Sequence, residues 1–119
     1  QQLSPNRISY NAAISACEKG AQWLLALEQF CDMRQRRVAP NVISFSAAIS
    51  ACEKGRHFLG AFELFSGMGL QHVAPDAICY NAILGACFTD GRWQQALILL
   101  CAMRQQGLAP RDGAVGTVA

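Results

Sequence analysis

The stretch AAISACEKG occurs twice in the chain, as Ala12–Gly20 and again, unchanged, as Ala47–Gly55. The two copies begin 35 positions apart. The four prolines keep the same spacing and stand at Pro5, Pro40, Pro75 and Pro110. A fixed period of about 20 to 50 residues is the signature of a stacked repeat architecture. The chain therefore consists mainly of one structural unit repeated in tandem.

Alignment on the prolines defines the boundaries of the units. Three units are complete, namely Arg7–Asn41, Val42–Asp76 and Ala77–Arg111. Residues 1–6 match the end of a preceding unit, because the proline at position 5 is again followed by asparagine. Residues 112–119 carry Val115 where the aromatic residue that opens a unit belongs, so we expect this tail to be frayed.

The apolar residues of each unit predict two helices. In the first unit, Tyr10, Ile14 and Cys17 share one face of a helix that we expect over about Tyr10–Lys19. Gly20 and Gly55 are expected at the C′ position that closes this helix. A second helix is expected over about Gln22–Gln35 and ends before the proline. Its expected buried face carries Trp23, Ala26, Leu27, Phe30 and Met33.

Two further stripes of the first helix have different roles. Ala12 and Ala16 form a small-residue stripe that lets a neighbouring helix approach closely. The third stripe is polar and comprises Asn11, Ser15, Glu18 and Lys19, with Ser46, Ser50, Glu53 and Lys54 as counterparts in the second unit. Helices this short are marginal alone, so stacking must stabilise them. The expected fold is all-α, a right-handed α-α superhelix (α-solenoid) of stacked helix-turn-helix repeats.

The overall composition is that of a folded chain without a strong electrostatic field. An apolar fraction of 52% is too high for a disordered segment. A net charge of +2 provides no strong attraction for phosphate. No apolar run is long enough to span a membrane, so we expect no membrane partner.

The cysteines and histidines indicate no metal site. Cys17, Cys52 and Cys87 follow the repeat period, and no C-x-x-C pair occurs. His57 and His72 complete no metal-ligand spacing. We expect the cysteines to be small apolar core residues in a reducing compartment. Because no nucleophile–base set or glycine-rich phosphate loop is present, we also expect no enzyme activity, cofactor or small-molecule substrate.

The opening and closing residues of the units carry a family resemblance. An aromatic residue followed by a small polar residue opens each unit, as Tyr10-Asn11, Phe45-Ser46 and Tyr80-Asn81. Proline followed by a polar residue closes each unit, as Pro40-Asn41, Pro75-Asp76 and Pro110-Arg111. The pattern resembles the pentatricopeptide repeat family, whose units are similar to VxYNxLIxxxxxxGxxxxALxLFxxMxxxGxxPD. The resemblance returns three times in register.

This resemblance implies a function and a set of site residues. Proteins of the family bind single-stranded RNA, about one base per repeat, usually in transcripts of mitochondria or chloroplasts, and other proteins of an RNA-processing complex are possible partners. In the family, the residue after the aromatic and the residue after the proline together choose the base. The implied pairs are Asn11 with Asn41, Ser46 with Asp76, and Asn81 with Arg111. An aliphatic residue two places before the aromatic packs against the base, which implies Ile8, Ile43 and Ile78.

The chemistry of the pairs suggests base preferences. Guanine offers N–H donors and an ionised Asp76 only accepts, so Ser46/Asp76 is expected to favour G. Asn11/Asn41 resembles family pairs that favour C over U. Arg111 departs from the family pattern, which leaves the third preference open. By the same resemblance, Lys19 and Lys54 are candidate phosphate contacts; the alternative is that they are solvated helix ends.

Two other interpretations remain open. The same solenoid could be a protein- or peptide-binding scaffold, which the small net charge favours. It could also be a purely structural segment of a longer array, in which the Asn11, Ser46 and Asn81 column contacts nothing. Added salt separates the first two interpretations, since RNA binding weakens with salt and an apolar peptide groove barely responds.

Overall fold

The computed structural model describes residues 6–20 and 22–108, and α-helix is the only regular secondary structure in these residues. Each of the six helices is 13 residues long. They are α1 (Arg7–Lys19), α2 (Trp23–Gln35), α3 (Val42–Lys54), α4 (Phe58–Leu70), α5 (Ala77–Thr89) and α6 (Trp93–Gln105). The all-α solenoid expected from the repeat is confirmed. The end of the preceding unit (up to residue 5), Arg111 and the 112–119 tail lie outside the described residues.

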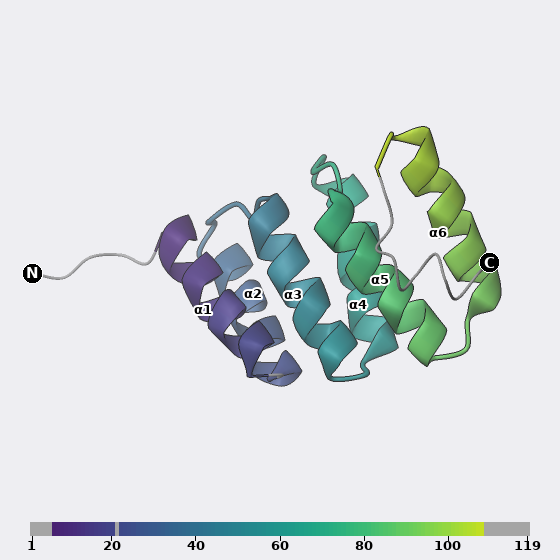
Figure 1. Cartoon of the computed structure of the whole chain (residues 1–119). Coiled ribbons are helices and arrows are strands. Elements are labelled where there is room, and N and C mark those ends of the chain that lie inside the picture. Colours follow the sequence, from purple (N-terminus) through teal and green to yellow (C-terminus); the bar gives the residue numbers. More distant parts are fainter. Residues whose placement is uncertain (1–5, 21, 109–119) are drawn as a thin grey trace, which may run out of the picture.

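The helices form two layers. The first helices of the units, α1, α3 and α5, lie side by side, while α2 and α4 lie behind them (Figure 1). α1 packs on α3 and α3 packs on α5, and each first helix also packs on the second helix of its own unit. The solenoid therefore presents one continuous row of first helices.

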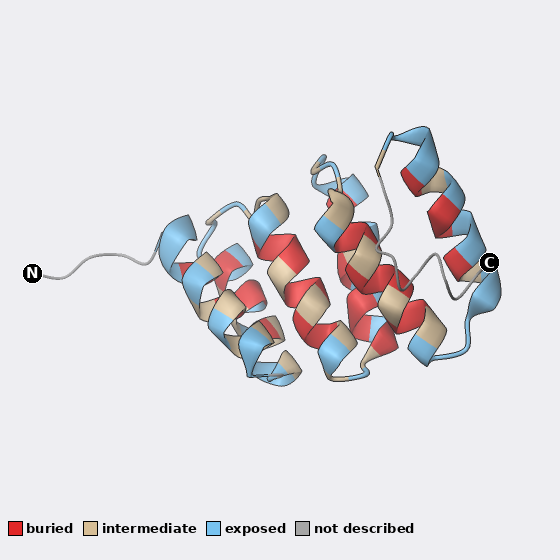
Figure 2. Ribbon diagram, viewed as in Figure 1, coloured by how far each residue is buried: buried red, intermediate tan, exposed pale blue. Residues whose placement is uncertain are grey.

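The small-residue stripe allows this close packing. Ala51, Ala82 and Ala86 are buried between neighbouring first helices, whereas Ala12 and Ala16 of α1 are exposed. In Figure 2, α1 is largely exposed and α3 is largely buried. The difference arises because α3 is covered on both sides, by α1 and α5.

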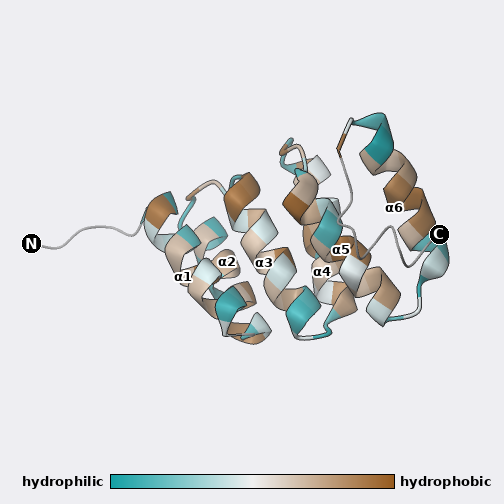
Figure 3. Cartoon of the chain, in the orientation of Figure 1, coloured by the Kyte–Doolittle hydropathy of each residue, from teal (hydrophilic) through white to brown (hydrophobic). Residues whose placement is uncertain are grey.

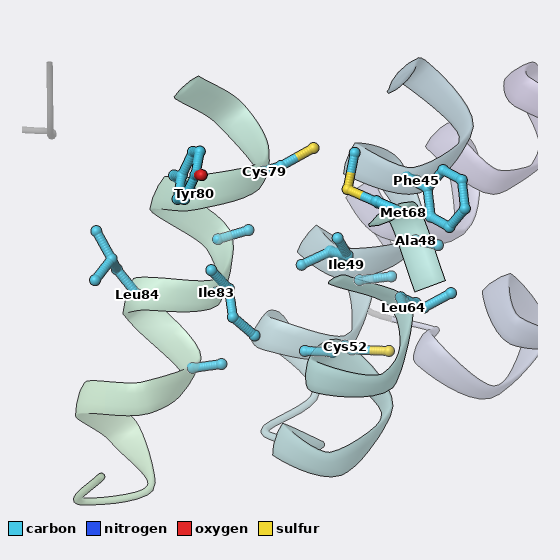
Figure 4. Close-up of a cluster of buried hydrophobic side chains, with 14 of the residues drawn as sticks. Phe45, Ala48, Ile49, Cys52, Leu64, Met68, Cys79, Tyr80, Ile83 and Leu84 are labelled. Carbon is cyan, nitrogen blue, oxygen red and sulfur yellow. The ribbon is translucent and has the colours of Figure 1, made fainter. Parts of the chain in front are cut away.

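Aromatic pairs recur at the same place in successive units. Phe30 of α2 lies 4.9 Å from Phe45 of α3, and Phe65 of α4 lies 5.2 Å from Tyr80 of α5, measured between ring centroids. The aliphatic core continues between α3 and α5, where Ile83 points toward Ile49 (Figure 4). Such edge-to-face and tilted contacts are favourable ring geometries, so the period seen in the sequence is a period of inter-unit contacts.

The first helices begin three residues earlier than the sequence pattern predicted. The helix expected from Tyr10 begins at Arg7, because Asn6 caps it by accepting a hydrogen bond from the Ser9 backbone N–H at 3.0 Å. Asn41 Oδ1 caps α3 by accepting a hydrogen bond from the Ser44 backbone N–H at 3.1 Å, and the Asp76 side chain caps α5 by accepting from the Cys79 backbone N–H. In the three described units, the residue after the proline is therefore the N-cap of the first helix that follows it.

The helix ends also differ from the prediction. Gly20 and Gly55 occupy the C-cap with negative φ, and the left-handed position after Gly55 belongs to Arg56, with φ 59°. Second helices end in a Schellman motif. In the first unit, Val38 N–H donates to Met33 O at 2.9 Å, and Arg37 is left-handed with φ 62°. The helix thus stops at Gln35, before the proline is reached.

The expectation for the cysteines is only partly correct. Cys52, Cys79 and Cys87 are buried, as expected, and Cys17 is partly buried. Cys31 of α2 and Cys101 of α6 are exposed, which differs from the expectation. Among the described residues, no group of side chains is arranged to hold a metal ion, and no helix is both long and apolar enough to cross a membrane.

Candidate nucleic-acid interface

The three residues that follow the opening aromatics, here called the reading residues, lie in a row. Asn11, Ser46 and Asn81 occupy the same position of α1, α3 and α5, which pack side by side. Asn11 and Asn81 are partly exposed. Ser46 differs from the exposed polar stripe expected of it, because it is only 7% exposed and its Oγ donates to Ile43 O at 3.1 Å. The Ser46 hydroxyl, at the reading position of the second unit, is therefore hydrogen-bonded to the backbone of its own helix.

The structure brings together both members of the first predicted pair. Asn11 Nδ2 donates to Asn41 Oδ1 at 3.2 Å, although the two residues are 30 positions apart. The capping role of Asn41 explains this geometry. The start of α3 is packed beside α1, so its N-cap comes next to the reading residue of the preceding helix.

The second and third pairs are arranged differently. Asp76 Oδ1 accepts from Cys79 N–H at 3.0 Å, while the Ser46 hydroxyl bonds within α3. Asp76 is partly exposed, so its second carboxylate oxygen is the acceptor that remains for a ligand. Of the third pair only Asn81 is described, since Arg111 falls in the undescribed end of the chain.

The three predicted base-packing residues are unusually exposed for isoleucine. Ile8, Ile43 and Ile78 have exposed fractions of 78%, 53% and 59%. Each lies in the first turn of its helix, and these first turns of α1, α3 and α5 are coloured as hydrophobic in Figure 3. Each isoleucine is three positions before a reading residue and shares its side of the helix. The row thus pairs an exposed apolar group with a polar group in every unit.

A hollow of about 410 Å³ lies along this row between α3 and α5. Ile78 and Asn81 line it from α5, and Glu53 lines it from α3. A Cβ on Gly85 would lie 2.6 Å from Glu53 Oε2, so the absent side chain at Gly85 gives room for this carboxylate. The hollow is within the size range of small-ligand sites.

The two candidate phosphate-binding lysines are not equivalent. Lys54 forms an ion pair with Glu18 of the preceding unit, and the side chains are 46% and 21% exposed. Lys19 is exposed at the end of α1. The ammonium of Lys54 is therefore partly neutralised, whereas the corresponding acidic partner of Lys19 would belong to a preceding unit.

Sequence reasoning missed the caps and a buried hydroxyl beside the first pair. Ser44 is 0% exposed, and its Oγ donates to Asn11 Oδ1. The signal was present in the sequence, because Asn and Asp are favoured N-caps and Asn41 precedes Ser44 by three positions, the spacing of a capping box.

Three family models match this chain and together span residues 5–111. They are a PPR repeat family model over residues 5–54, a PPR repeat model over 43–71 and a pentatricopeptide repeat domain model over 63–111. The chain belongs to the pentatricopeptide repeat family. No match was found among curated proteins.

Solved structures share the pentatricopeptide repeat fold. The pentatricopeptide repeat protein PPR10 from maize superposes with a TM-score of 0.78 and 23% identity, over 96% of this chain and 16% of PPR10. PPR10 in complex with an 18-nt psaJ RNA element gives a TM-score of 0.78 and 22% identity, over 90% of this chain and 16% of that one. The PPR domain of Arabidopsis thaliana protein-only RNase P 1, in complex with tRNA, gives 0.83 and 14%, over 98% of this chain and 61% of that one. The chain thus spans only part of each of these proteins.

Proposed function

We propose that this chain binds single-stranded RNA along the row of first helices, with about one base per unit. The hydrogen bond between Asn11 and Asn41 carries the proposal, because it joins the two residues that the repeat pattern assigns to one base. The exposed isoleucines support it, since each supplies an apolar surface beside a reading residue. Two of the similar structures contain RNA, one with PPR10 and one with the RNase P domain.

The capping bonds give a chemical basis for base choice. Asn41 Oδ1 is used by Ser44 N–H and Asn11 Nδ2, which leaves the Asn41 amide NH2 as the group offered to a base. Amide donors suit the N3 and O2 acceptors of cytosine better than the N3–H of uracil. Asp76 offers a carboxylate oxygen instead, which suits the N1–H and N2–H donors of guanine. The proposed reading of the first two units is therefore C followed by G, with the protein N-terminus toward the RNA 5′ end.

The proposed setting is RNA metabolism in a mitochondrion or chloroplast, as the family resemblance implies. The role is one of binding rather than catalysis, whether the process is processing, stability, editing or translation. Other proteins of an RNA-processing complex are proposed as further partners.

A peptide-binding scaffold is the second candidate function. The observation that favours it is an apolar hollow of about 580 Å³ in the layer of second helices, lined by Phe30 of α2 and by Phe62 and Leu64 of α4. Such a surface fits an apolar side chain of a partner better than a nucleotide backbone.

A binding series on short RNAs tests the proposal. Labelled eight-nucleotide RNAs carry C-G in an A-rich background, and each of the two positions is varied in turn while salt is raised. We expect tighter binding with G at the second position and weakening at higher salt. Absence of any base preference, together with binding unchanged when Asn11, Ser46 and Asn81 are all replaced by alanine, contradicts it.

A further inference from the structure

Ser44 connects the cap of one unit to the reading residue of the unit before it. Its Oγ accepts the Asn41 backbone N–H at 3.1 Å. A hydroxyl has one proton to donate, and the two possible acceptors are Asn11 Oδ1 and, at 3.1 Å, Asn41 Oδ1. Because Asn11 Oδ1 is the nearer of the two, the proton goes to Asn11.

The Asn11 amide is consequently held at both ends. Its Nδ2 donates to Asn41 Oδ1 and its Oδ1 accepts from Ser44. A flipped amide would place the Asn11 and Asn41 side-chain oxygens together and lose the Asn11–Asn41 bond, so the unflipped orientation is favoured. Asn11 then presents one remaining N–H and one remaining lone pair to a ligand.

The next unit lacks this arrangement. The residue equivalent to Ser44 is Cys79, which is also 0% exposed. Burial raises the pKa of the Cys79 thiol to about 12, so it stays a neutral thiol and a weak hydrogen-bond donor. The reading residue that precedes it, Ser46, donates to its own helix at Ile43 O. The two reading residues are thus held by different means.

We infer that Ser44 is a positioning residue for base selection, which fixes the Asn11 amide so that the first unit distinguishes C from U. The inference rests on the proposed function and names a residue that acts on specificity without touching RNA, since Ser44 is fully buried. In this arrangement, the third residue of the second unit determines how firmly the reading residue of the first unit is oriented.

Three variants of the full chain separate positioning from capping. Ser44→Ala removes the hydroxyl, and Ser44→Thr keeps it. Ser9→Ala is the matched control, because Ser9 Oγ also donates to an N-cap, Asn6, at 3.2 Å, but its contact is to the cap of its own helix. Should Ser44→Ala unfold, Ser44→Cys replaces it, since the third unit packs a buried cysteine at the equivalent place.

The measurement is the ratio of dissociation constants for AAACGAAA and AAAUGAAA at fixed low salt. We expect Ser44→Ala to reduce the preference for C roughly three- to tenfold, as expected for the loss of one hydrogen bond. The preference for G at the next position should stay unchanged, and Ser44→Thr and Ser9→Ala should keep the wild-type ratio. If the Ser44→Ala variant keeps the wild-type preference for C, the inference is wrong, while the proposed function is unaffected. Failure of the wild-type chain to bind either RNA overturns the proposed function, and the inference with it.

Discussion

Trp23 of the first unit stacks on His57 of the second, with ring centroids 4.1 Å apart and an interplanar angle of 20°. The same junction recurs one unit later, where the Arg92 guanidinium lies 4.4 Å from the Phe58 ring centroid. Each junction joins the start of one second helix to the residue that precedes the next. These contacts tie the second-helix layer together at one end of the solenoid.

Replacement of Gly55 should break this junction. A Cβ at Gly55 would lie 2.1 Å from Trp23 Cδ1, so Gly55→Ala must displace the Trp23 ring and its stack on His57. We expect a loss of about 1–3 kcal/mol in the free energy of unfolding, measured by urea denaturation. Gly69→Ala is the control, because nothing lies within 4 Å of a Cβ there, and it should stabilise α4 by about 0.5–1 kcal/mol. Equal changes in the free energy of unfolding for the two variants would show that the position of the Trp23 ring does not require the absence of a side chain at Gly55.

Salt dependence should distinguish the two lysines. We expect Lys19→Met to remove one phosphate contact and so make the slope of log K against log salt less negative by about 0.7. Lys54→Met should change the slope less, because the Lys54 ammonium is already paired with Glu18. Fluorescence anisotropy titrations between low and moderate salt measure both slopes. A larger change for Lys54→Met than for Lys19→Met would mean that RNA displaces Glu18 from the pair.

The cysteines should differ in their reactivity toward iodoacetamide at pH 8. Burial raises the pKa of Cys52 and Cys87 to about 11 and that of Cys79 to about 12. A raised pKa leaves little of the reactive thiolate at pH 8, so these three should be protected in the native chain. Cys31 and Cys101 are exposed and should react first.

Peptide mass spectrometry follows each site over time. Denatured protein is the control, in which all six cysteines should be labelled. Native Cys79 that is alkylated as fast as Cys31 would contradict the buried position of Cys79.

The sequence was sufficient for the fold because the period constrains every unit at once. Alanine at Ala51 and Ala86, in matching positions, already indicated where first helices pack closely. The second-helix face predicted around Ala26, Phe30 and Met33 is buried as expected. Such agreement arises because burial in a solenoid repeats with the sequence.

Local and inter-unit details were less accessible. The early start of the first helices depends on a cap bond that competes with other turn conformations, and the apolar pattern does not show it. Left-handed residues at Arg37, Arg56 and His72 could not be read from residue type, since glycine is the usual occupant. The burial of Ser46 and the hydrogen bond between Ser44 and Asn11 depend on contacts between units, and the sequence of one unit does not show these contacts.

Conversion of Asn41 to aspartate tests the central claim most directly. Asn41→Asp keeps an oxygen for the Ser44 backbone N–H and therefore keeps the cap of α3. It replaces the outward amide NH2 with a carboxylate oxygen, which accepts from uracil N3–H and opposes the acceptors of cytosine. We predict that the ratio of affinities for AAACGAAA and AAAUGAAA inverts from C-preferring to U-preferring, with the preference for G at the next position retained. An unchanged preference for C would contradict base reading by Asn41.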